Sequence, residues 1–368
     1  MSHSMSNTHF AILGCGSAAV PVAQAITSSP YTSLTLVHDI VPALARDLGE
    51  CYHVPYTTEL DELLNATDVD AIYIAVPHHL LAPLTKQVLT AGKHALVEKP
   101  MALTLNDADD LISFAESEGL TLGVFYEMRY APGFALARQI VQGGALGEII
   151  GVRMQTLIDK APTYWQAGYM NRSVNSWRGE KERAGGGIVL MNTSHLLDAL
   201  WYVTGLNITR VSAERDTLIA NVEVEDTASA TFRFDNGAVG SLFSGAHIAG
   251  AHADEWFDIY GTRGTLRVSD PYHSKPLQIF LRDAWRDTPA QTWHELPIHP
   301  INVFESAIND FAQALQSHRP APINGHDARR VLEIILAIYE SAEQNIVETL
   351  RRNVSSLGML ANERMRTE

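Results

Sequence analysis

A lysine in one short segment of the chain has a setting that suits proton handling. Lys99 lies in the tripeptide Glu98-Lys99-Pro100, directly after an apolar run that predicts a strand. A lysine that shares a closed cleft with another positive charge holds its proton less tightly, because like charge and desolvation both disfavour the ammonium form. Such a side chain could help to move a proton to or from a hydroxyl group. On its own, however, a lysine at a strand end is most often simply solvated.

A second segment places a histidine where it could share that task. The glycine run at 185–187 leads into a predicted helix in which Asn192, His195 and Asp198 follow one another at intervals of three residues. Residues spaced in this way lie on one face of a helix, so Asn192 and His195 can enter one cleft. A neutral imidazole suits general base catalysis near pH 7. A lone helical histidine is more often a packed or capping residue, so this segment alone leaves both interpretations open.

A glycine pattern near the start of the chain predicts a dinucleotide site. Gly14, Gly16 and Ala19 fit G-x-G-x-x-G/A between a predicted strand and a predicted helix. This pattern allows a tight turn, close approach of a pyrophosphate to the backbone, and close packing of helix on strand. Asp39 follows about 25 residues after Gly14, near the position of the acid that binds ribose hydroxyls. A carboxylate there repels a 2′-phosphate, and the nearest arginine after it is Arg46, so we expect NAD rather than NADP.

These residues need elements to position them, and the first third of the chain supplies alternating strands and helices. The segment 71–76 is continuously apolar, as is typical of a strand buried on both faces. The alternation predicts βαβ units in a parallel, doubly wound sheet. The expected strands are 10–13, 34–37, 71–76, 95–97 and 121–125, and the expected helices are 19–26, 42–48, 79–91 and 105–118.

The pattern changes after residue 125. Residues 226–234 alternate between apolar and polar, and Asp235-Asn236-Gly237 is a hairpin turn signal. Further strands are expected at 147–157, 238–243, 255–260, 264–268 and 277–282, and helices at 188–203, 303–316 and 327–351. Period two with hairpin turns predicts an antiparallel sheet with one face exposed or used in assembly. We therefore expect a dinucleotide domain over 1–125, a substrate-binding and oligomerisation α/β domain over 126–352, and a tail over 353–368.

Composition excludes several classes of partner. The chain has 368 residues and a formal net charge of −15, which repels the phosphates of nucleic acid and of anionic membrane surfaces. Its two cysteines cannot form a disulfide framework, which indicates a reducing compartment. No apolar run reaches the ~18 residues of a membrane span. The early apolar stretch lacks a preceding cationic segment, so a signal peptide is not expected, and we predict a cytoplasmic protein.

Taken together, these motifs resemble the glucose–fructose oxidoreductase/inositol dehydrogenase (Gfo/Idh/MocA) family over nearly the whole chain. The residues that carry the resemblance are Gly14-x-Gly16, Asp39, Val76-Pro77, Glu98-Lys99-Pro100, Arg129-x-x-Pro132 and Gly185-Gly186-Gly187 with His195-x-x-Asp198. The resemblance implies a Rossmann domain followed by an α/β domain with a large, mostly antiparallel open sheet. It implies an NAD(P)-dependent dehydrogenase or reductase that acts on a carbinol carbon of a sugar, cyclitol or sugar acid. It also implies a homo-oligomer, a dimer or tetramer built on the sheet face.

The resemblance implies roles for individual residues as well. Lys99 and His195 would be the catalytic pair, and His195 would take the hydroxyl proton while Lys99 hydrogen-bonds the same oxygen. The expected catalytic residues are Lys99, His195 and Asn192. The expected cofactor-binding residues are Gly14, Gly16, Ser17, Ala18, Asp39, Val76, Pro77, His78, Glu98 and Lys99. The expected substrate-binding residues are Tyr126, Tyr164, Arg172, Trp177, Asn192 and His195, and no metal site is expected.

Two departures from the family pattern affect these roles. Many members carry Asp four residues before the histidine, whereas this chain has Met191 there and Asn192 next to it. Asn cannot accept a proton, so Asn192 is interpreted as an orienting hydrogen-bonder, and a carboxylate partner for His195 is in doubt. Many members also have Asn after the proline of the fourth strand and His four residues beyond it, where this chain has His78 and Leu81.

Two other classes of function remain open at this level. A lyase or glycosidase that uses tightly bound NAD only transiently would have the same fold and would show no net NADH production. A non-enzymatic NAD-sensing regulator would also share the fold. The presence of both Lys99 and His195 argues against the regulator, because a sensor does not need them.

Overall fold

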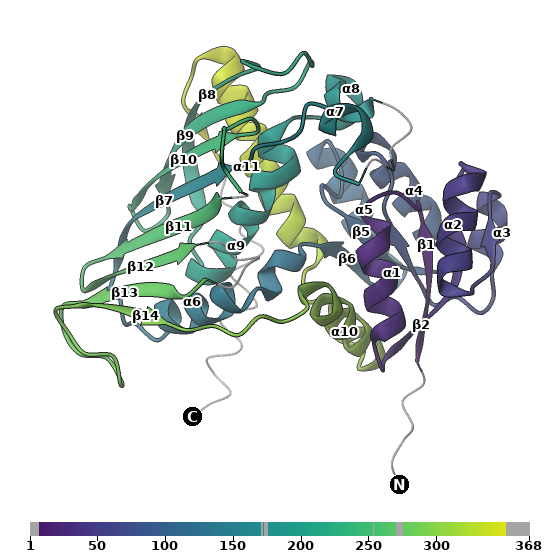
Figure 1. Ribbon diagram of the computed structural model, residues 1–368, viewed down its shortest axis with the longest axis horizontal. Helices are drawn as coiled ribbons and strands as arrows, with labels where there is room; N and C mark the ends of the chain where they lie inside the picture. The colour runs from purple at the N-terminus through teal and green to yellow at the C-terminus, as the bar shows by residue number, and fades with distance from the viewer. Residues whose placement is uncertain (1–6, 171, 173–175, 253, 270–274, 351–368) are drawn as a thin grey trace, which may run out of the picture.

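The computed structural model describes residues 7–170, 172, 176–252, 254–269 and 275–350. Its chain forms two sheets that face each other across a layer of helices (Figure 1). The predicted tail over 353–368 lies outside the described residues. Among the described helices, none combines the length and the apolar character needed to cross a bilayer.

The first sheet is parallel and six-stranded, with the order β3-β2-β1-β4-β5-β6. Its strands are β1 (Thr8–Leu13), β2 (Thr32–His38), β3 (Tyr56–Thr57), β4 (Ala71–Ile74), β5 (His94–Glu98) and β6 (Leu122–Phe125). Helices α1 (Ala19–Ser28), α2 (Pro42–Tyr52), α3 (Leu60–Asn65), α4 (His78–Thr90) and α5 (Leu105–Ser117) connect them. The strand order reverses between β1 and β4, the point at which doubly wound sheets bind ligands. The predicted Rossmann arrangement is confirmed, and Thr104 caps α5 by accepting a hydrogen bond from the Asp107 amide.

The second sheet has nine strands in the order β14-β13-β12-β11-β7-β10-β9-β8-β15. They are β7 (Ile149–Leu157), β8 (Ile208–Asp216), β9 (Thr227–Phe234), β10 (Val239–Gly245), β11 (Asp254–Gly261), β12 (Gly264–Ser269), β13 (Leu277–Leu281), β14 (Trp293–Leu296) and β15 (Glu348–Thr349). Strands β7 and β10 pair in parallel, and the other described pairs are antiparallel. The hairpin predicted at 235–237 joins β9 to β10. This confirms the mostly antiparallel open sheet.

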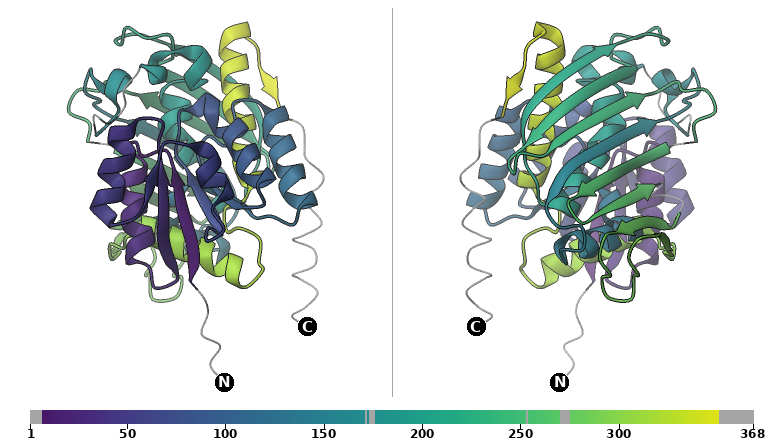
Figure 2. Two further views of the ribbon diagram at one scale, coloured as in Figure 1. Left: turned by 90° about the vertical axis from the view of Figure 1, so that its right-hand side faces the viewer. Right: turned by 90° about the vertical axis from the view of Figure 1, so that its left-hand side faces the viewer.

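The two faces of this sheet differ. Its inner face packs on α6 (Pro132–Gln142), α9 (Ser194–Thr204) and α11 (Gly325–Gln344). None of the described helices covers its outer face, as the right-hand view of Figure 2 shows. The alternation predicted for 226–234 follows this difference, because Ala228, Ala230, Phe232 and Phe234 are buried while the residues between them are more exposed.

One helix lies away from the region to which the sequence assigns it. Helix α10 (Val303–Gln316), expected within the second domain, packs against α1 of the first sheet (Figure 1). Its Ile308 and Phe311 are buried in the same apolar cluster as Phe10 and Ile26. An amphipathic pattern fixes which side of a helix is buried but does not say which partner buries it.

A buried ion network ties the two parts together. Arg129 lies in the short 3₁₀ turn η1 (Glu127–Tyr130) directly after β6. Its guanidinium group binds the Asp198 carboxylate of α9 and donates to Asp327 Oδ2 of α11 at 3.0 Å. Paired in this way, the charges can be buried without the full cost of desolvation. The chain therefore leaves the first sheet through an anchored turn.

Candidate active site

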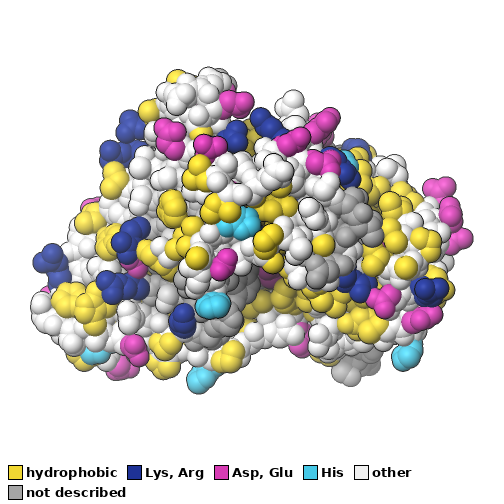
Figure 3. Space-filling view, turned by 45° about the horizontal axis from the view of Figure 1, so that its top comes forward, with side chains coloured by type: hydrophobic (Ala, Val, Ile, Leu, Met, Phe, Trp, Pro, Cys, Tyr) yellow, Lys and Arg dark blue, Asp and Glu magenta, His cyan; other side chains and the backbone are white. Residues whose placement is uncertain are grey.

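A cavity of about 890 Å³ lies at the carboxyl ends of the first sheet's strands, and both parts of the molecule line it. Its wall carries Gly14, Asp39 and Lys99 from the first sheet and Asn192 and His195 from the second part. Four short elements border it: α7 (Tyr164–Ala167), η2 (Trp177–Gly179), α8 (Lys181–Ala184) and the π-helical turn η3 (Val189–Thr193). Figure 3 brings the upper side of Figure 1 forward and shows Lys and Arg side chains close to Asp and Glu side chains on that surface.

The glycine loop after β1 has the geometry of a dinucleotide cradle. Gly14 has φ +96°, and a Cβ there would lie 2.4 Å from the Ala75 carbonyl oxygen. Its amide donates to the His38 carbonyl at 2.8 Å, which fixes the loop against β2. A Cβ at Gly16, in contrast, would meet no atom within 4 Å. Gly16 thus leaves open space beside the first turn of α1, where a phosphate would need to approach the backbone.

Asp39 is held rigidly at the end of β2. Its Oδ2 accepts the Cys15 amide at 2.7 Å, and its Oδ1 accepts the Val41 amide at 2.8 Å. The next residue, Ile40, is exposed and supplies no positive charge for a 2′-phosphate. Ser17, Ala18, Val76, Pro77 and His78 line the same cavity, as the sequence predicts.

Lys99 joins the two parts of the site. Its Nζ donates to the Met191 carbonyl oxygen at 2.6 Å, across to the turn η3. Next to it, Glu98 accepts the buried Tyr73 hydroxyl at 2.5 Å. Burial raises the pKa of Glu98, and the neighbouring Lys99 opposes this shift. The Lys99–Pro100 peptide bond is cis. The hydrogen bond to Met191 thus places Lys99 beside the turn η3, which leads into the helix that carries His195.

His195 and Asn192 lie together with polar atoms that the protein itself leaves unpaired. His195 is 6% exposed, and burial together with the Lys99 charge lowers the pKa of His195 well below its usual range. Its Nδ1 and the Oδ1 of Asn192 have no hydrogen-bond partner among the described residues. Buried polar atoms without partners are uncommon and mark a place where a ligand can supply the missing bond.

The sequence analysis overlooked one acidic side chain at this end. Glu127 follows β6 directly, is 8% exposed, and brings Oε2 to 3.8 Å from His195 Nδ1. Burial and then the Glu98 charge raise the pKa of Glu127 to about 8. Its position just after the carboxyl end of a parallel strand is the signal that could have identified it.

His78 and Trp177 connect the first sheet to the second part. The His78 ring donates from Nδ1 to the Ala184 carbonyl at 2.7 Å and meets the Trp177 ring edge-on at 4.6 Å between centroids. Burial lowers the pKa of His78 to about 3, so this imidazole stays neutral. Both side chains line the cavity, His78 where a cofactor residue was predicted and Trp177 where a substrate residue was predicted.

Tyr164 also lines the cavity, beside positive charges. Lys160 Nζ lies 3.5 Å from the centre of its ring, and the Tyr164 hydroxyl donates to Met191 Sδ at 3.5 Å. Burial alone would raise the pKa of Tyr164, but the charges of Lys160 and Arg178 outweigh it and lower the pKa.

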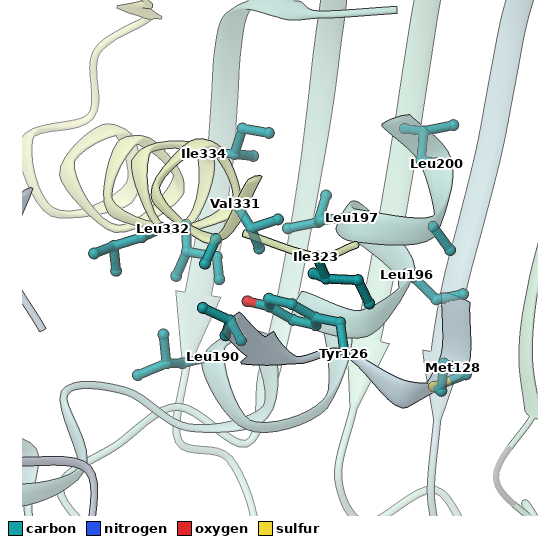
Figure 4. Packing of buried hydrophobic residues seen from close by; sticks show 14 of the residues in the cluster. Tyr126, Met128, Leu190, Leu196, Leu197, Leu200, Ile323, Val331, Leu332 and Ile334 are labelled. Carbon is teal, nitrogen blue, oxygen red and sulfur yellow. The ribbon is translucent and has the colours of Figure 1, made fainter. Parts of the chain in front are cut away.

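Two other predicted substrate residues, Arg172 and Tyr126, make their contacts in different places. Arg172 lines the cavity at the dinucleotide loop, where its guanidinium group donates to the Cys15 carbonyl and to Asp47 Oδ2 at 2.6 Å. Tyr126 is 2% exposed and packs among core residues such as Leu190 and Ile323 (Figure 4). Its ring packs edge-on against the His195 ring, with 5.7 Å between the ring centroids. The start of the turn η1 directs the Tyr126 side chain toward the apolar interior.

The glycine run before His195 is required by close packing. A Cβ at Gly187 would lie 1.8 Å from the Glu225 carbonyl oxygen, and one at Gly186 would lie 2.0 Å from the Tyr339 hydroxyl. The Glu225 carboxylate accepts the Gly187 and Val189 amides at 2.8 and 3.0 Å and the Tyr339 hydroxyl at 2.9 Å. This buried acid therefore fixes the start of the predicted helix, which opens as the π turn.

Comparison with known families covers both parts of the chain. Residues 8–126 match the family described as "Oxidoreductase family, NAD-binding Rossmann fold", and residues 134–267 match the "GFO/IDH/MocA C-terminal domain". A similar curated protein is 1,5-anhydro-D-fructose reductase of Ensifer adhaerens, 29% identical over 287 residues, covering 77% of this chain and 81% of that protein. Levoglucosan dehydrogenase of Pseudarthrobacter phenanthrenivorans is 27% identical over 66% of each chain.

Solved structures extend the likeness in fold. A levoglucosan dehydrogenase in complex with NADH superposes with a TM-score of 0.85 at 22% identity, over 94% of this chain and all of that one. The WlbA dehydrogenase of Bordetella pertussis, in complex with NADH and UDP-GlcNAcA, superposes with a TM-score of 0.82 at 22% identity, over 95% and 99% of the two chains. Both likenesses concern the arrangement of the two sheets.

Proposed function

The chain belongs to the Gfo/Idh/MocA family of NAD-binding oxidoreductases, and from this premise we propose that it oxidises or reduces one carbinol carbon of a sugar, cyclitol or sugar acid. One observation carries the proposal: Lys99 of the first sheet and His195 of the second part line the same cavity as the glycine loop and Asp39. A hydroxyl in that cavity would meet a proton acceptor and a hydrogen-bond donor next to the nucleotide-binding strand ends.

The residues of the cradle fit NAD. Open space at Gly16 suits a pyrophosphate at the start of α1, and the fixed carboxylate of Asp39 suits ribose hydroxyls. Val76, Pro77 and Glu98 would border the nicotinamide end. The fixed carboxylate of Asp39, followed by the uncharged and exposed Ile40, supports NAD over NADP, because a 2′-phosphate there would meet a negative charge.

The residues at the other end suit proton transfer. When bound, the nicotinamide supplies the carbon that accepts or gives the hydride. His195 is neutral and would take the hydroxyl proton on Nε2 during oxidation and return it during reduction. Lys99 would donate a hydrogen bond to the same oxygen, and the unpaired Oδ1 of Asn192 would accept one from a neighbouring hydroxyl of the substrate.

Carbohydrate-like substrates suit the remaining wall of the cavity. Tyr164 and Trp177 present aromatic surface, and Lys160 and Arg178 present donors for hydroxyl or carboxylate groups. The names of the relatives support the same class of substrate, since they specify 1,5-anhydro-D-fructose, levoglucosan and D-xylose as what those enzymes act on.

The decisive experiment is NADH formation at 340 nm with purified protein, NAD and a panel of sugars, inositols and sugar acids, with NADP in parallel. A substrate-dependent rise with NAD supports the proposal and identifies the substrate. No rise with any compound, with NAD found tightly retained by mass spectrometry, would overturn it in favour of the lyase or glycosidase with transient oxidation.

We include a homo-oligomer and a cytoplasmic location in the proposal. Ile150, Val239, Phe243 and Trp293 leave apolar side chains exposed on strands of the open sheet, which supports a second copy covering that face. The two cysteines are both free, which suits a reducing compartment. Light scattering should show a dimer or tetramer. Phe243→Glu should dissociate this assembly, whereas Leu218→Glu, which lies outside the sheet, should leave it intact.

A further inference from the structure

We infer that Glu127 is the positioning residue of His195: its carboxylate orients the imidazole, holds a proton on Nδ1 and leaves Nε2 free for the substrate hydroxyl. The inference deepens the proposed function and rests on it for the role of Nε2. The pairing itself concerns two side chains of the free protein and can be tested without a substrate.

The geometry brings these two groups together from separate elements. Glu127 is supplied by the turn after β6 and His195 by α9, and both side chains are almost fully buried. Glu127 Oε2 lies 3.8 Å from His195 Nδ1, which has no hydrogen-bond partner among the described residues. Moving the two atoms together by less than ~1 Å would give an ordinary hydrogen bond. The edge-on Tyr126 ring limits how far the imidazole can turn away.

The other acidic candidates near His195 are already engaged. Asp198, one turn along α9, binds the guanidinium of Arg129 through both of its oxygens. Glu98 accepts the Tyr73 hydroxyl and the Lys99 amide. Position 191, where many family members carry a carboxylate, is Met191. Glu127, which follows the end of β6, thus supplies the free carboxylate that position 191 lacks.

The charges around Glu127 control when it is ionised. Glu98 and Glu255 oppose its negative charge and Lys99 favours it, while the phenols of Tyr73, Tyr126 and Tyr169 stay neutral. Burial and the Glu98 charge raise the pKa of Glu127 to about 8 in the free protein. Oxidation should therefore accelerate as pH rises through this ionisation, because the carboxylate form stabilises the imidazolium that arises when His195 takes a proton.

Two protons are involved in this arrangement, one on His195 Nδ1 and one on the substrate hydroxyl. Before reaction, the proton of neutral His195 lies on Nδ1 and faces the carboxylate, and Nε2 carries a free electron pair. The hydroxyl proton then forms a bond to Nε2, and the resulting positive charge is balanced by Glu127. In the reverse direction the same proton returns from Nε2 to the substrate oxygen, and Glu127 keeps its charge throughout.

The first test observes the imidazole directly. Protein labelled with ¹⁵N-histidine is titrated from pH 6 to 10 by NMR without substrate, and the His195 signals are assigned by their loss in His195→Gln. We expect Nε2 to be pyridine-like and the His195 signals to shift with a midpoint near 8, and this shift to disappear in Glu127→Gln. Unchanged His195 signals in Glu127→Gln would overturn the pairing, whatever the substrate proves to be.

The second test uses turnover with the substrate found at 340 nm. Glu127→Gln should lower kcat by about 10²-fold and remove the ionisation near 8 from the pH profile, while Glu127→Asp restores part of both. The matched control is Glu116→Gln, which removes the acid of an exposed Glu–His pair, Glu116 Oε1 to His326 Nε2 at 2.9 Å, and should change neither. Equal losses in Glu127→Gln and Glu127→Asp would mean a packing role and would contradict the inference.

Discussion

Asp39 and His195, at the two ends of the cavity, are held in different ways. At the dinucleotide end, both oxygens of Asp39 are bonded to backbone amides, and the amide of Gly14 is bonded to β2. At the catalytic end, His195 Nδ1 and Asn192 Oδ1 are buried without a partner among the described residues. Asp39 follows the end of strand β2, whereas Asn192 and His195 lie on the turn η3 and helix α9.

This difference has an energetic meaning. A satisfied hydrogen bond contributes about 1 kcal/mol to stability, whereas a buried polar atom without a partner costs about 1–3 kcal/mol. The carboxylate of Asp39 is therefore fixed in the folded protein before any ligand arrives, although Ser17 Oγ of the same site has no partner among the described residues. The catalytic end holds Asn192 Oδ1 at a cost to stability that a ligand could offset, whereas the inferred partner of His195 Nδ1 is Glu127.

The largest expected effect separates chemistry from binding at the catalytic end. Lys99→Met should lower kcat by about 10²–10⁴-fold, because the hydrogen bond to the reacting oxygen is lost. Binding of NADH, followed by fluorescence, should persist because the cradle at the other end is intact. The control is Lys86→Met, a lysine over the Phe114 ring that does not line the cavity. Full turnover in Lys99→Met would remove the proposed mechanism.

The next largest effect contrasts two glycines of one loop. Gly14→Ala should destabilise the fold by about 2–4 kcal/mol, since it adds a clash with the Ala75 carbonyl to an unfavourable positive φ. Gly16→Ala meets open space, so its stability should stay within about 0.5 kcal/mol while NAD affinity falls about tenfold. Urea unfolding and NADH titration measure the two quantities. Equal destabilisation by both variants would contradict the preformed cradle.

The same contrast explains what the sequence could predict. Gly14 and Asp39 could be predicted because each belongs to a local pattern with a fixed relation to one strand or helix, whereas the roles predicted for Lys99 and His195 rest on the family resemblance. The strand end could have pointed to Glu127 as a cavity residue, but not to its pairing with His195, which lies 68 residues later on α9, because no spacing rule connects a strand end to a helix of another layer.

Tertiary packing decided the other differences. Tyr126 lies one residue before Glu127, yet the turn sends its ring into the core. Helix α10 was predicted with its observed bounds, but the choice of α1 as its partner depends on complementary apolar surfaces that the local pattern does not encode. The π turn at η3 follows from the fit of Gly186 and Gly187 against Tyr339 and Glu225.

A smaller effect should appear as acid sensitivity at the catalytic end. The pKa of His78 is about 3 in the folded protein and near its usual 6.5 when unfolded, so below pH 6.5 the unfolded state binds more protons. Folding stability should then fall by about 1.4 kcal/mol for each pH unit between 6.5 and 3 from this residue alone. In His78→Gln the slope of unfolding free energy against pH should be shallower by that amount.

The control for that slope is an exposed histidine. His326→Gln replaces a side chain that is more than half exposed, and the slope in this variant should match the wild type. His195 is also held neutral by burial, so a residual slope of the same sign should remain in His78→Gln. If His78→Gln and the wild type lost stability with acid at the same rate, the buried imidazole would not be the cause.

The smallest expected effect tests the unpaired atom itself. Asn192→Ala removes an Oδ1 that has no partner among the described residues, so the variant should be at least as stable to unfolding as the wild type. The matched change is Asn324→Ala, whose Oδ1 accepts the His326 and Asp327 amides as the cap of α11 and should cost about 1 kcal/mol. Turnover should reverse this order, with kcat/KM lowered about tenfold in Asn192→Ala and retained in Asn324→Ala. A loss of stability in Asn192→Ala as large as that of the cap would mean that Asn192 is part of the framework, and the contrast between the two ends of the cavity would no longer hold.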